Sequence, residues 1–85
     1  MTYVIISTSN FDRGLRKLSG VDRTRSRKVI DDILRDPYSY RELSGRYNEL
    51  RSARFGDHRI IYAIRESAKE IVLLAVEARS SVYGR

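Results

Sequence analysis

Two arginines, Arg54 and Arg59, stand on either side of the dipeptide Gly56-Asp57, and their spacing lets them act on one anion. A glycine followed by another residue suits a two-residue hairpin loop of type II′. In that loop Arg54 and Arg59 are cross-strand partners, so both guanidinium groups project from the same face of the sheet. Opposed guanidinium groups repel each other unless they splay into water or flank an anion. The spacing therefore leaves two interpretations open, a solvated pair of cations or a phosphate site.

A second candidate pair, Arg79 and Tyr83, lies near the end of the sequence. Arg79 comes just after the apolar stretch 71–76 and is therefore expected at one end of a sheet. Arginine stabilises the charged pentacovalent phosphate of RNA cleavage, and a phenol takes the proton of a 2′-hydroxyl or stacks on a base. Together with the two hairpin arginines, this pair predicts a site for RNA cleavage. The alternative for Tyr83 is an aromatic side chain that packs back on the domain.

The composition excludes most other catalytic templates. The 85 residues contain no cysteine and one histidine, His58. The chain therefore has no disulfide, no thiolate nucleophile, and no set of histidine and cysteine ligands for a metal. We expect neither a metal nor another cofactor. His58, beside the predicted turn, is expected to be a packing or surface residue rather than a catalyst.

The charge predicts a polyanionic partner, because the formal net charge is +6 and 14 of the 17 cations are arginine. The charge is spread evenly along the chain, so a binding site has to be formed by folding. An arginine excess can equally follow from genomic base composition. No apolar run approaches the roughly 20 residues that span a bilayer, and no cationic signal opens the sequence. We therefore expect a single cytoplasmic domain over residues 1–85, with no membrane partner.

The patterns of apolar residues predict the elements that position these side chains. Strands are predicted at residues 3–6, 50–55, 58–65 and 71–76. The last has no polar alternation, which is typical of a strand at the centre of a sheet. One helix is predicted over residues 11–18 and another from a cap at Asp22 to Asp36, before a polar connection at 37–49. The fold class is therefore α+β, with an N-terminal strand and a two-helix pair packed on a mostly antiparallel four-stranded sheet.

Two segments, LRSARFGDHRIIYAI (50–64) and IVLLAVEARSSVY (71–83), follow an apolar strand and two basic helices. In this pattern the chain resembles the short RelE-type members of the RelE/ParE superfamily of bacterial and archaeal toxins, over residues 3–83. The resemblance implies a RelE-like fold and the toxin of a type II toxin–antitoxin system. It implies a metal-free, ribosome-dependent endoribonuclease, an mRNA interferase that stops translation. In such enzymes the 2′-hydroxyl attacks the adjacent phosphate, leaving a 2′,3′-cyclic phosphate and a 5′-hydroxyl. It also implies a cognate antitoxin that blocks the toxin.

The resemblance assigns roles position by position. Arg59 matches the transition-state arginine after the hairpin turn, and Arg79 matches the second phosphate-binding arginine after the last strand. Tyr83 matches the C-terminal tyrosine of the site, and Arg54 matches one member of a basic pair on the preceding strand. Basic residues of the helices are expected to dock on ribosomal RNA, unless they form only a solvated surface. These residues are Arg13, Arg16, Lys17, Arg23 and Arg27.

The chain departs from the family pattern at several positions. Ser52 stands where the family has the second member of the basic pair. Arg51 is the candidate to replace that member in RNA binding, although the predicted register places Arg51 on the opposite face of the sheet. Ala78 precedes Arg79 where some relatives have a histidine that can act as a base. Arginine does not accept a proton, so Tyr83 is left as the only evident base. These departures leave open a toxin that is weakened.

Two other functions remain open from the sequence. A ParE-like protein that inhibits DNA gyrase by binding shares the fold and needs no such site. A weakened relative, or a plain RNA-binding module, would bind RNA or the ribosome without cutting. The presence of Arg59, Arg79 and Tyr83 together favours the nuclease.

Overall fold

The fold is one layer of helices on one sheet. The structure is a computed structural model that describes residues 2–43 and 49–78. Its elements, in chain order, are β1 (Val4–Ser7), α1 (Ser9–Arg16), α2 (Gly20–Arg35), β2 (Arg41–Glu42), β3 (Leu50–Phe55), β4 (His58–Arg65), the 3₁₀ turn η2 (Glu66–Ala68) and β5 (Glu70–Ala78).

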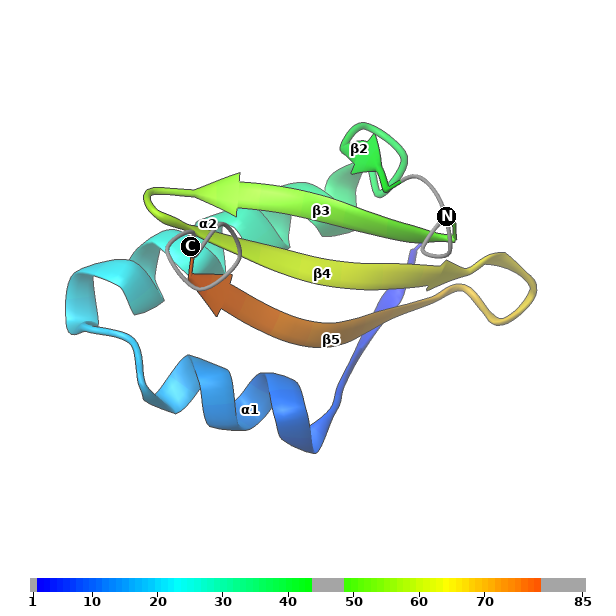
Figure 1. Ribbon diagram of the computed structural model, residues 1–85. Helices are drawn as coiled ribbons and strands as arrows, with labels where there is room; N and C mark the ends of the chain where they lie inside the picture. The colour runs from blue at the N-terminus through cyan, green and yellow to red at the C-terminus, as the bar shows by residue number, and fades with distance from the viewer. Residues whose placement is uncertain (1, 44–48, 79–85) are drawn as a thin grey trace.

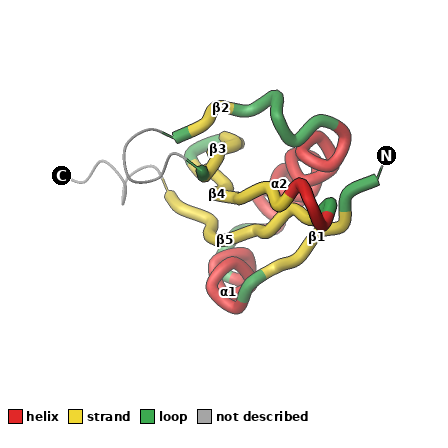
Figure 2. Tube along the Cα trace, turned by 90° about the vertical axis from the view of Figure 1, so that its right-hand side faces the viewer, coloured by secondary structure: helices red, strands yellow, loops and turns green. Residues whose placement is uncertain are grey.

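The five strands form a single sheet in the order β1-β5-β4-β3-β2. Neighbours run antiparallel except β1 and β5, which are parallel. Both helices lie on one face, with α1 along β5 and α2 behind β3 and β4 (Figures 1 and 2). We call this the helix face and the other the open face. The predicted α+β class and helix pair are confirmed. The strand predicted at the centre of the sheet, β5, lies one place from it, because β4 is the middle strand.

The sheet has one strand more than predicted. Arg41 and Glu42 fall inside the predicted connection 37–49, yet they pair with Ser52 and Arg51 as β2. A two-residue strand carries no alternation for a sequence pattern to detect, because only backbone hydrogen bonds define it.

The second helix begins earlier than predicted. The hydroxyl of Ser19 accepts a hydrogen bond from the backbone N–H of Asp22, so Ser19 caps α2 and Asp22 lies inside it. A serine oxygen that binds the third helical N–H satisfies one of the donors left open at a helix start. Gly20, which the predicted cap at Asp22 left outside both helices, is therefore the first residue of α2.

The core lies between the helices and the sheet. Phe11 of α1 and Ile33 of α2 are buried against Ile60, Tyr62 and Ile71 of the central strands. The Tyr62 hydroxyl donates a hydrogen bond of 2.7 Å to the carbonyl of Pro37. Burial raises the pKa of Tyr62 to about 12. This phenol therefore stays protonated and holds the end of α2 to the sheet.

The β3–β4 hairpin has the predicted register. Arg54 pairs with Arg59 and Phe55 with His58 across the turn. Gly56 has a φ of +53°, a value that suits glycine, and Asp57 does not have a positive φ. A positive φ at the first loop position alone is the pattern of a type II′ turn. The hairpin therefore aims both arginines at the open face.

A β-bulge interrupts the pairing of β4 with β5, because Leu74 has no partner on β4. Beyond the bulge, Glu77 pairs with Arg59. An uninterrupted ladder would have paired Glu77 with His58, on the helix face. Since side chains alternate along a strand, the one extra residue turns Glu77 to the open face.

Candidate phosphate-binding site

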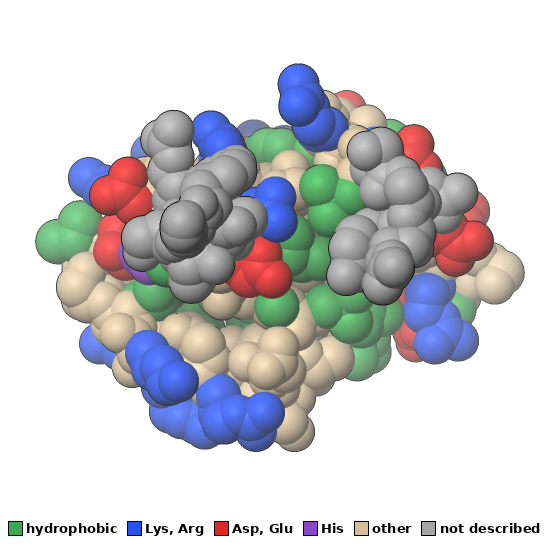
Figure 3. Space-filling model, viewed as in Figure 1, with side chains coloured by type: hydrophobic (Ala, Val, Ile, Leu, Met, Phe, Trp, Pro, Cys, Tyr) green, Lys and Arg blue, Asp and Glu red, His purple; other side chains and the backbone are tan. Residues whose placement is uncertain are grey.

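A row of three charged side chains crosses the open face. Arg54 of β3 is the partner of Arg59 on β4, and Arg59 is the partner of Glu77 on β5. The row lies at the end of the sheet where β5 ends (Figure 1). Figure 3, which views the sheet from the side opposite α2, shows basic and acidic side chains next to one another beside hydrophobic ones. The open face is therefore charged at the end that carries the hairpin turn.

A hollow of about 400 Å³ lies on this face. Its lining residues are Arg41, Leu43, Ser52, Arg54 and Arg59. Three of these five residues are arginines, whose planar guanidinium groups bind phosphate through paired hydrogen bonds. The hollow therefore suits a phosphate group. The sequence patterns do not predict Arg41 as a site residue, because its place depends on β2.

Glu77 holds one edge of the Arg59 guanidinium group. Nε and Nη2 of Arg59 donate to the same carboxylate oxygen, Oε1 of Glu77, at 3.2 and 3.0 Å. The side chains are 24% and 40% exposed. Nη1 of Arg59 and Oε2 of Glu77 make no hydrogen bond to any residue in the ranges 2–43 and 49–78. The pair therefore presents one donor and one acceptor that a ligand can use.

The sequence patterns do not predict Glu77 as a site residue, and the reason is physical. The alternation of Ile71 and Leu73 on the helix face would continue through Ala75 to Glu77. Only the bulge at Leu74 breaks this alternation, and nothing in the local sequence marks it. The cross-strand register of β4 and β5 is the signal that would have found the pair.

Arg51 does not lie beside the arginines of the hollow. It lies on the helix face, and its Nη1 donates to the carbonyl of Tyr40 at 2.7 Å and to that of Tyr38 at 3.4 Å. Its guanidinium carbon lies 5.1 Å from the centre of the Tyr38 ring. Arg51 therefore fastens the segment between α2 and β2 to the sheet.

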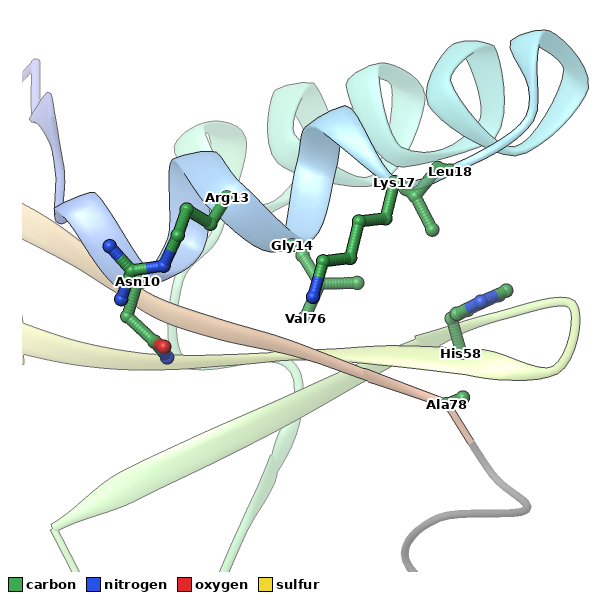
Figure 4. A pocket seen from close by; sticks show the side chains of 8 residues that line it. All are labelled: Asn10, Arg13, Gly14, Lys17, Leu18, His58, Val76 and Ala78. Atoms are coloured by element: carbon green, nitrogen blue, oxygen red, sulfur yellow. The ribbon is translucent and has the colours of Figure 1, made fainter.

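Two helix cations line a different pocket. Arg13 and Lys17 extend from α1 over β5, and with His58 they border a pocket of about 280 Å³ (Figure 4). Gly14 lets the helix approach closely, because an added Cβ would lie 3.3 Å from Cβ of Val76. The remaining predicted docking residues are exposed on the helices: Arg16, Arg23 and Arg27. Lys and Arg side chains gather over α1 in the lower part of Figure 3.

His58 packs on the helix face. Its ring stacks on Phe55 with the ring centres 5.5 Å apart. Its Nδ1 is buried and makes no hydrogen bond to the described part of the chain, and it lies 3.7 Å from a carboxylate oxygen of Asp22. His58 is therefore separated from the arginine row by the sheet.

Of the four predicted catalytic residues, the structure brings Arg54 and Arg59 together. Arg79 and Tyr83 lie outside the described residues. Within ranges 2–43 and 49–78, no three His, Asp or Glu side chains are placed to hold a metal ion. In the same ranges, no helix is long and apolar enough to cross a membrane.

Comparisons with solved structures find the same fold. The RelBE2 toxin–antitoxin complex from Mycobacterium tuberculosis is 26% identical, with 93% of this chain and 100% of that chain covered and a TM-score of 0.84. The RelE–RelB complex from Pyrococcus horikoshii OT3 is 25% identical, with 93% and 97% covered and a TM-score of 0.73. The isolated RelE toxin from E. coli, at 20% identity, shares the fold, with 95% and 90% covered and a TM-score of 0.79.

The sequence comparisons give the family. No curated protein sequence matches the chain. The family model of the ParE toxin of the type II toxin–antitoxin system parDE matches residues 21–83, well over half of the chain. The family model is thus of ParE type, and the three solved structures above are of RelE type. The chain belongs to the ParE toxin family of type II toxin–antitoxin systems, within the RelE/ParE superfamily.

Proposed function

We propose that this chain acts as an endoribonuclease, a metal-free mRNA interferase that cuts mRNA on the ribosome. The observation that carries the proposal is the opposition of Arg54 and Arg59 on one face, at a hollow lined by three arginines. The planar guanidinium groups of this hollow can bind one phosphate through paired hydrogen bonds. A protein that only binds gyrase has no need of such a phosphate site.

The proposed reaction is attack of a ribose 2′-oxygen on the adjacent phosphate. Arg54 and Arg59 hold the scissile phosphate and stabilise the charge that grows on it. Removal of one such preorganised donor slows a reaction by about 10²–10³-fold. Arg79 is proposed as a second phosphate ligand, and Tyr83 as a residue that takes a proton or stacks on a base. Both follow β5 in the sequence, which ends beside this row.

The exposed helix cations are proposed to dock on ribosomal RNA. They lie on α1 and α2, away from the arginine row, so docking and cleavage would use different surfaces. Phosphate contacts by such cations supply affinity that falls steeply with salt. The residues are Arg13, Arg16, Lys17, Arg23 and Arg27.

A cognate antitoxin is the proposed protein partner. The M. tuberculosis relative is a toxin–antitoxin complex and the P. horikoshii relative is a RelE–RelB complex. The open face offers an antitoxin charged and apolar side chains together, since Arg54 and Arg59 share this face with the half-buried Ala63 and Ala75. We expect acidic residues of the antitoxin to approach the arginines.

The alternative is a DNA gyrase inhibitor that acts by binding. The match to the ParE toxin model favours it. Such a protein would use surface contacts and would not depend on the opposition of Arg54 and Arg59.

Two parallel assays separate these functions. The purified chain is added to a translation reaction, where primer extension detects cuts in the mRNA, and to a gyrase supercoiling reaction. We expect cuts in mRNA and unchanged supercoiling, with cutting lost in Arg59→Ala. Arg65→Ala is the matched control, because Arg65 lies on the same strand and pairs with Glu70 at the opposite end. Intact mRNA together with inhibited supercoiling would establish the gyrase inhibitor instead.

A further inference from the structure

We infer that Glu77 is a catalytic residue whose Oε2 accepts the proton of the attacking 2′-hydroxyl. The inference rests on the proposed ribonuclease function and assigns the proton of the attacking hydroxyl to Glu77 in place of Tyr83. It is carried by the geometry of the Arg59–Glu77 pair. Arg59 occupies only Oε1 of the carboxylate, and the side chain remains 40% exposed on the open face.

The pair sets a donor and an acceptor side by side. With Nε and Nη2 committed to Glu77, the Nη1 group of Arg59 is left to bind a phosphate oxygen. The 2′-hydroxyl that attacks is attached to the ribose next to that phosphate. Cross-strand partners have Cβ atoms about 4.5–5.5 Å apart. A phosphate on Arg59 therefore brings its 2′-hydroxyl within reach of the neighbouring carboxylate.

Three described tyrosines and the histidine are poorer bases. Tyr62 is buried, and its pKa is raised to about 12. Hydrogen bonds to Glu66 raise the pKa of Tyr3 and of Tyr38, so these phenols stay protonated. His58 lies on the helix face, stacked on Phe55.

The only other carboxylate that projects from β5 on the open face is Glu70, at the far end of the strand. Seven residues separate it from Glu77, a distance of more than about 20 Å along a regular strand. Glu70 pairs with Arg65 in the same cross-strand manner, at 3.5 Å. It is thus remote from the arginine hollow and serves as a control.

The proton and the bonds balance in one step. The 2′-hydroxyl proton passes to Oε2 of Glu77 while the bond from the 2′-oxygen to phosphorus forms. The bond from phosphorus to the 5′-oxygen breaks, and the leaving oxygen takes a proton from water. The products are a 2′,3′-cyclic phosphate and a 5′-hydroxyl, and Glu77 returns its proton to solvent.

The salt bridge couples this transfer to phosphate binding. As Glu77 takes up the proton it loses its charge, and its attraction for Arg59 weakens. At the same moment negative charge grows on the phosphate. The positive charge of Arg59 is therefore released from the carboxylate when the transition state needs it.

Glu77→Gln separates proton transfer from positioning. The amide oxygen of glutamine can still accept from Nε and Nη2 of Arg59, but the side chain cannot take up the proton. Glu70→Gln removes one charge from the same strand and face. Single-turnover cleavage of mRNA on programmed ribosomes is measured for the wild type and both variants, across a range of pH. Affinity is measured separately, with a substrate that carries a 2′-deoxy nucleotide at the cut site.

We expect Glu77→Gln to slow cleavage by about 10²–10⁴-fold, with affinity for the uncleavable substrate unchanged or tighter. The cleavage rate of the wild type should fall as the pH is lowered, and the rate of Glu77→Gln should not show this fall. The charged groups that face Glu77 from the other strands are all arginines: Arg59 on β4, with Arg54 on β3 and Arg41 on β2 beyond it. They keep their charge throughout that range. Glu70→Gln should match the wild type in every measurement.

Two results would overturn the assignment. If Glu77→Gln cleaves at the wild-type rate and its rate still falls at low pH, another group takes the proton. A loss of cleavage explained fully by weaker binding would make Glu77 a structural partner of Arg59. A wild-type protein that cuts no mRNA at all would instead reject the ribonuclease function itself.

Discussion

Glu77 and Arg59 form a salt bridge across β5 and β4, with Oε1 of Glu77 3.0 Å from Nη2 of Arg59. This contact exists because the bulge at Leu74 shifts the end of β5 by one residue. Without that shift the carboxylate would project from the helix face, and Arg59 would lack this salt bridge. The bulge thus sets the electrostatics of the open face, at the place where the proposed chemistry occurs.

Arg54 is predicted to contribute to RNA binding as well as to cleavage. Arg54→Ala should weaken binding of the uncleavable substrate and reduce the slope of log affinity against log salt by about one, since one phosphate contact is lost. The cleavage rate should fall by a larger factor than the affinity. Arg35→Ala is the control, because Arg35 is an exposed cation at the end of α2 that pairs only locally with Asp32. If the two variants have equal salt slopes, Arg54 does not contact the RNA.

The docking surface on α1 is predicted to act through charge. The double change Arg13→Glu and Lys17→Glu reverses the two cations that border the helix-side pocket. Affinity for ribosomes, measured by co-sedimentation at increasing salt, should fall strongly at low salt and converge with the wild type at high salt. The helices should be unchanged by circular dichroism. Undiminished ribosome binding at low salt would show that these cations are only a solvated surface.

The hairpin and the helix pair could be predicted from the sequence, but half of the site could not. The Gly56-Asp57 loop fixes the register of Arg54 and Arg59, because a two-residue loop allows one pairing. The register of Glu77 depends on a bulge inside β5, which is set by packing rather than by a local residue signal. Arg41 joins the hollow through β2, whose two residues have no pattern of their own.

Tyr62 is predicted to stabilise the fold without a part in the chemistry. Tyr62→Phe removes the hydrogen bond to the carbonyl of Pro37 and leaves that carbonyl unpaired in the core. The free energy of unfolding should therefore fall by about 1–3 kcal/mol. The pKa of Tyr62 is raised from 10.0 to about 12, so the folded state holds this proton more tightly than the unfolded state. Its contribution to stability is complete below pH 10 and is lost as the pH rises towards about 12.

Denaturant unfolding of the wild type and Tyr62→Phe across this alkaline range measures the effect. The wild type should lose more stability than the variant as the pH rises. Parallel curves would contradict the assigned burial of the phenol, and a loss of cleavage per folded molecule would contradict its purely structural role.

Glu66 is predicted to tie three segments together. It accepts hydrogen bonds from the hydroxyls of Tyr3 and Tyr38, each at 2.7 Å, and from Lys69. These hydrogen bonds, of which the one from Lys69 has the largest effect, lower the pKa of Glu66 to about 2. A depressed pKa stabilises the folded state at pH values above the ordinary range of a glutamate, and this stability is lost as the pH falls towards about 2.

Glu66→Gln should therefore lower the thermal midpoint at neutral pH and flatten its fall in acid. Glu42→Gln, at an exposed position of β2, is the matched change. The measurement is a series of thermal unfolding curves between neutral and acid pH. Identical curves for Glu66→Gln and the wild type would show that the contacts of Glu66 carry no net stability.

Cleavage by 2′-oxygen attack at the arginine row is the central claim, and one substrate tests it most directly. An mRNA with a single 2′-deoxy nucleotide at the mapped cut site is placed on programmed ribosomes with the wild-type chain, beside the all-ribose mRNA. We predict that the all-ribose mRNA is cut to a 2′,3′-cyclic phosphate and a 5′-hydroxyl, while the substituted mRNA stays intact at that position. Equal cutting of both, or products with a 5′-phosphate, would contradict it.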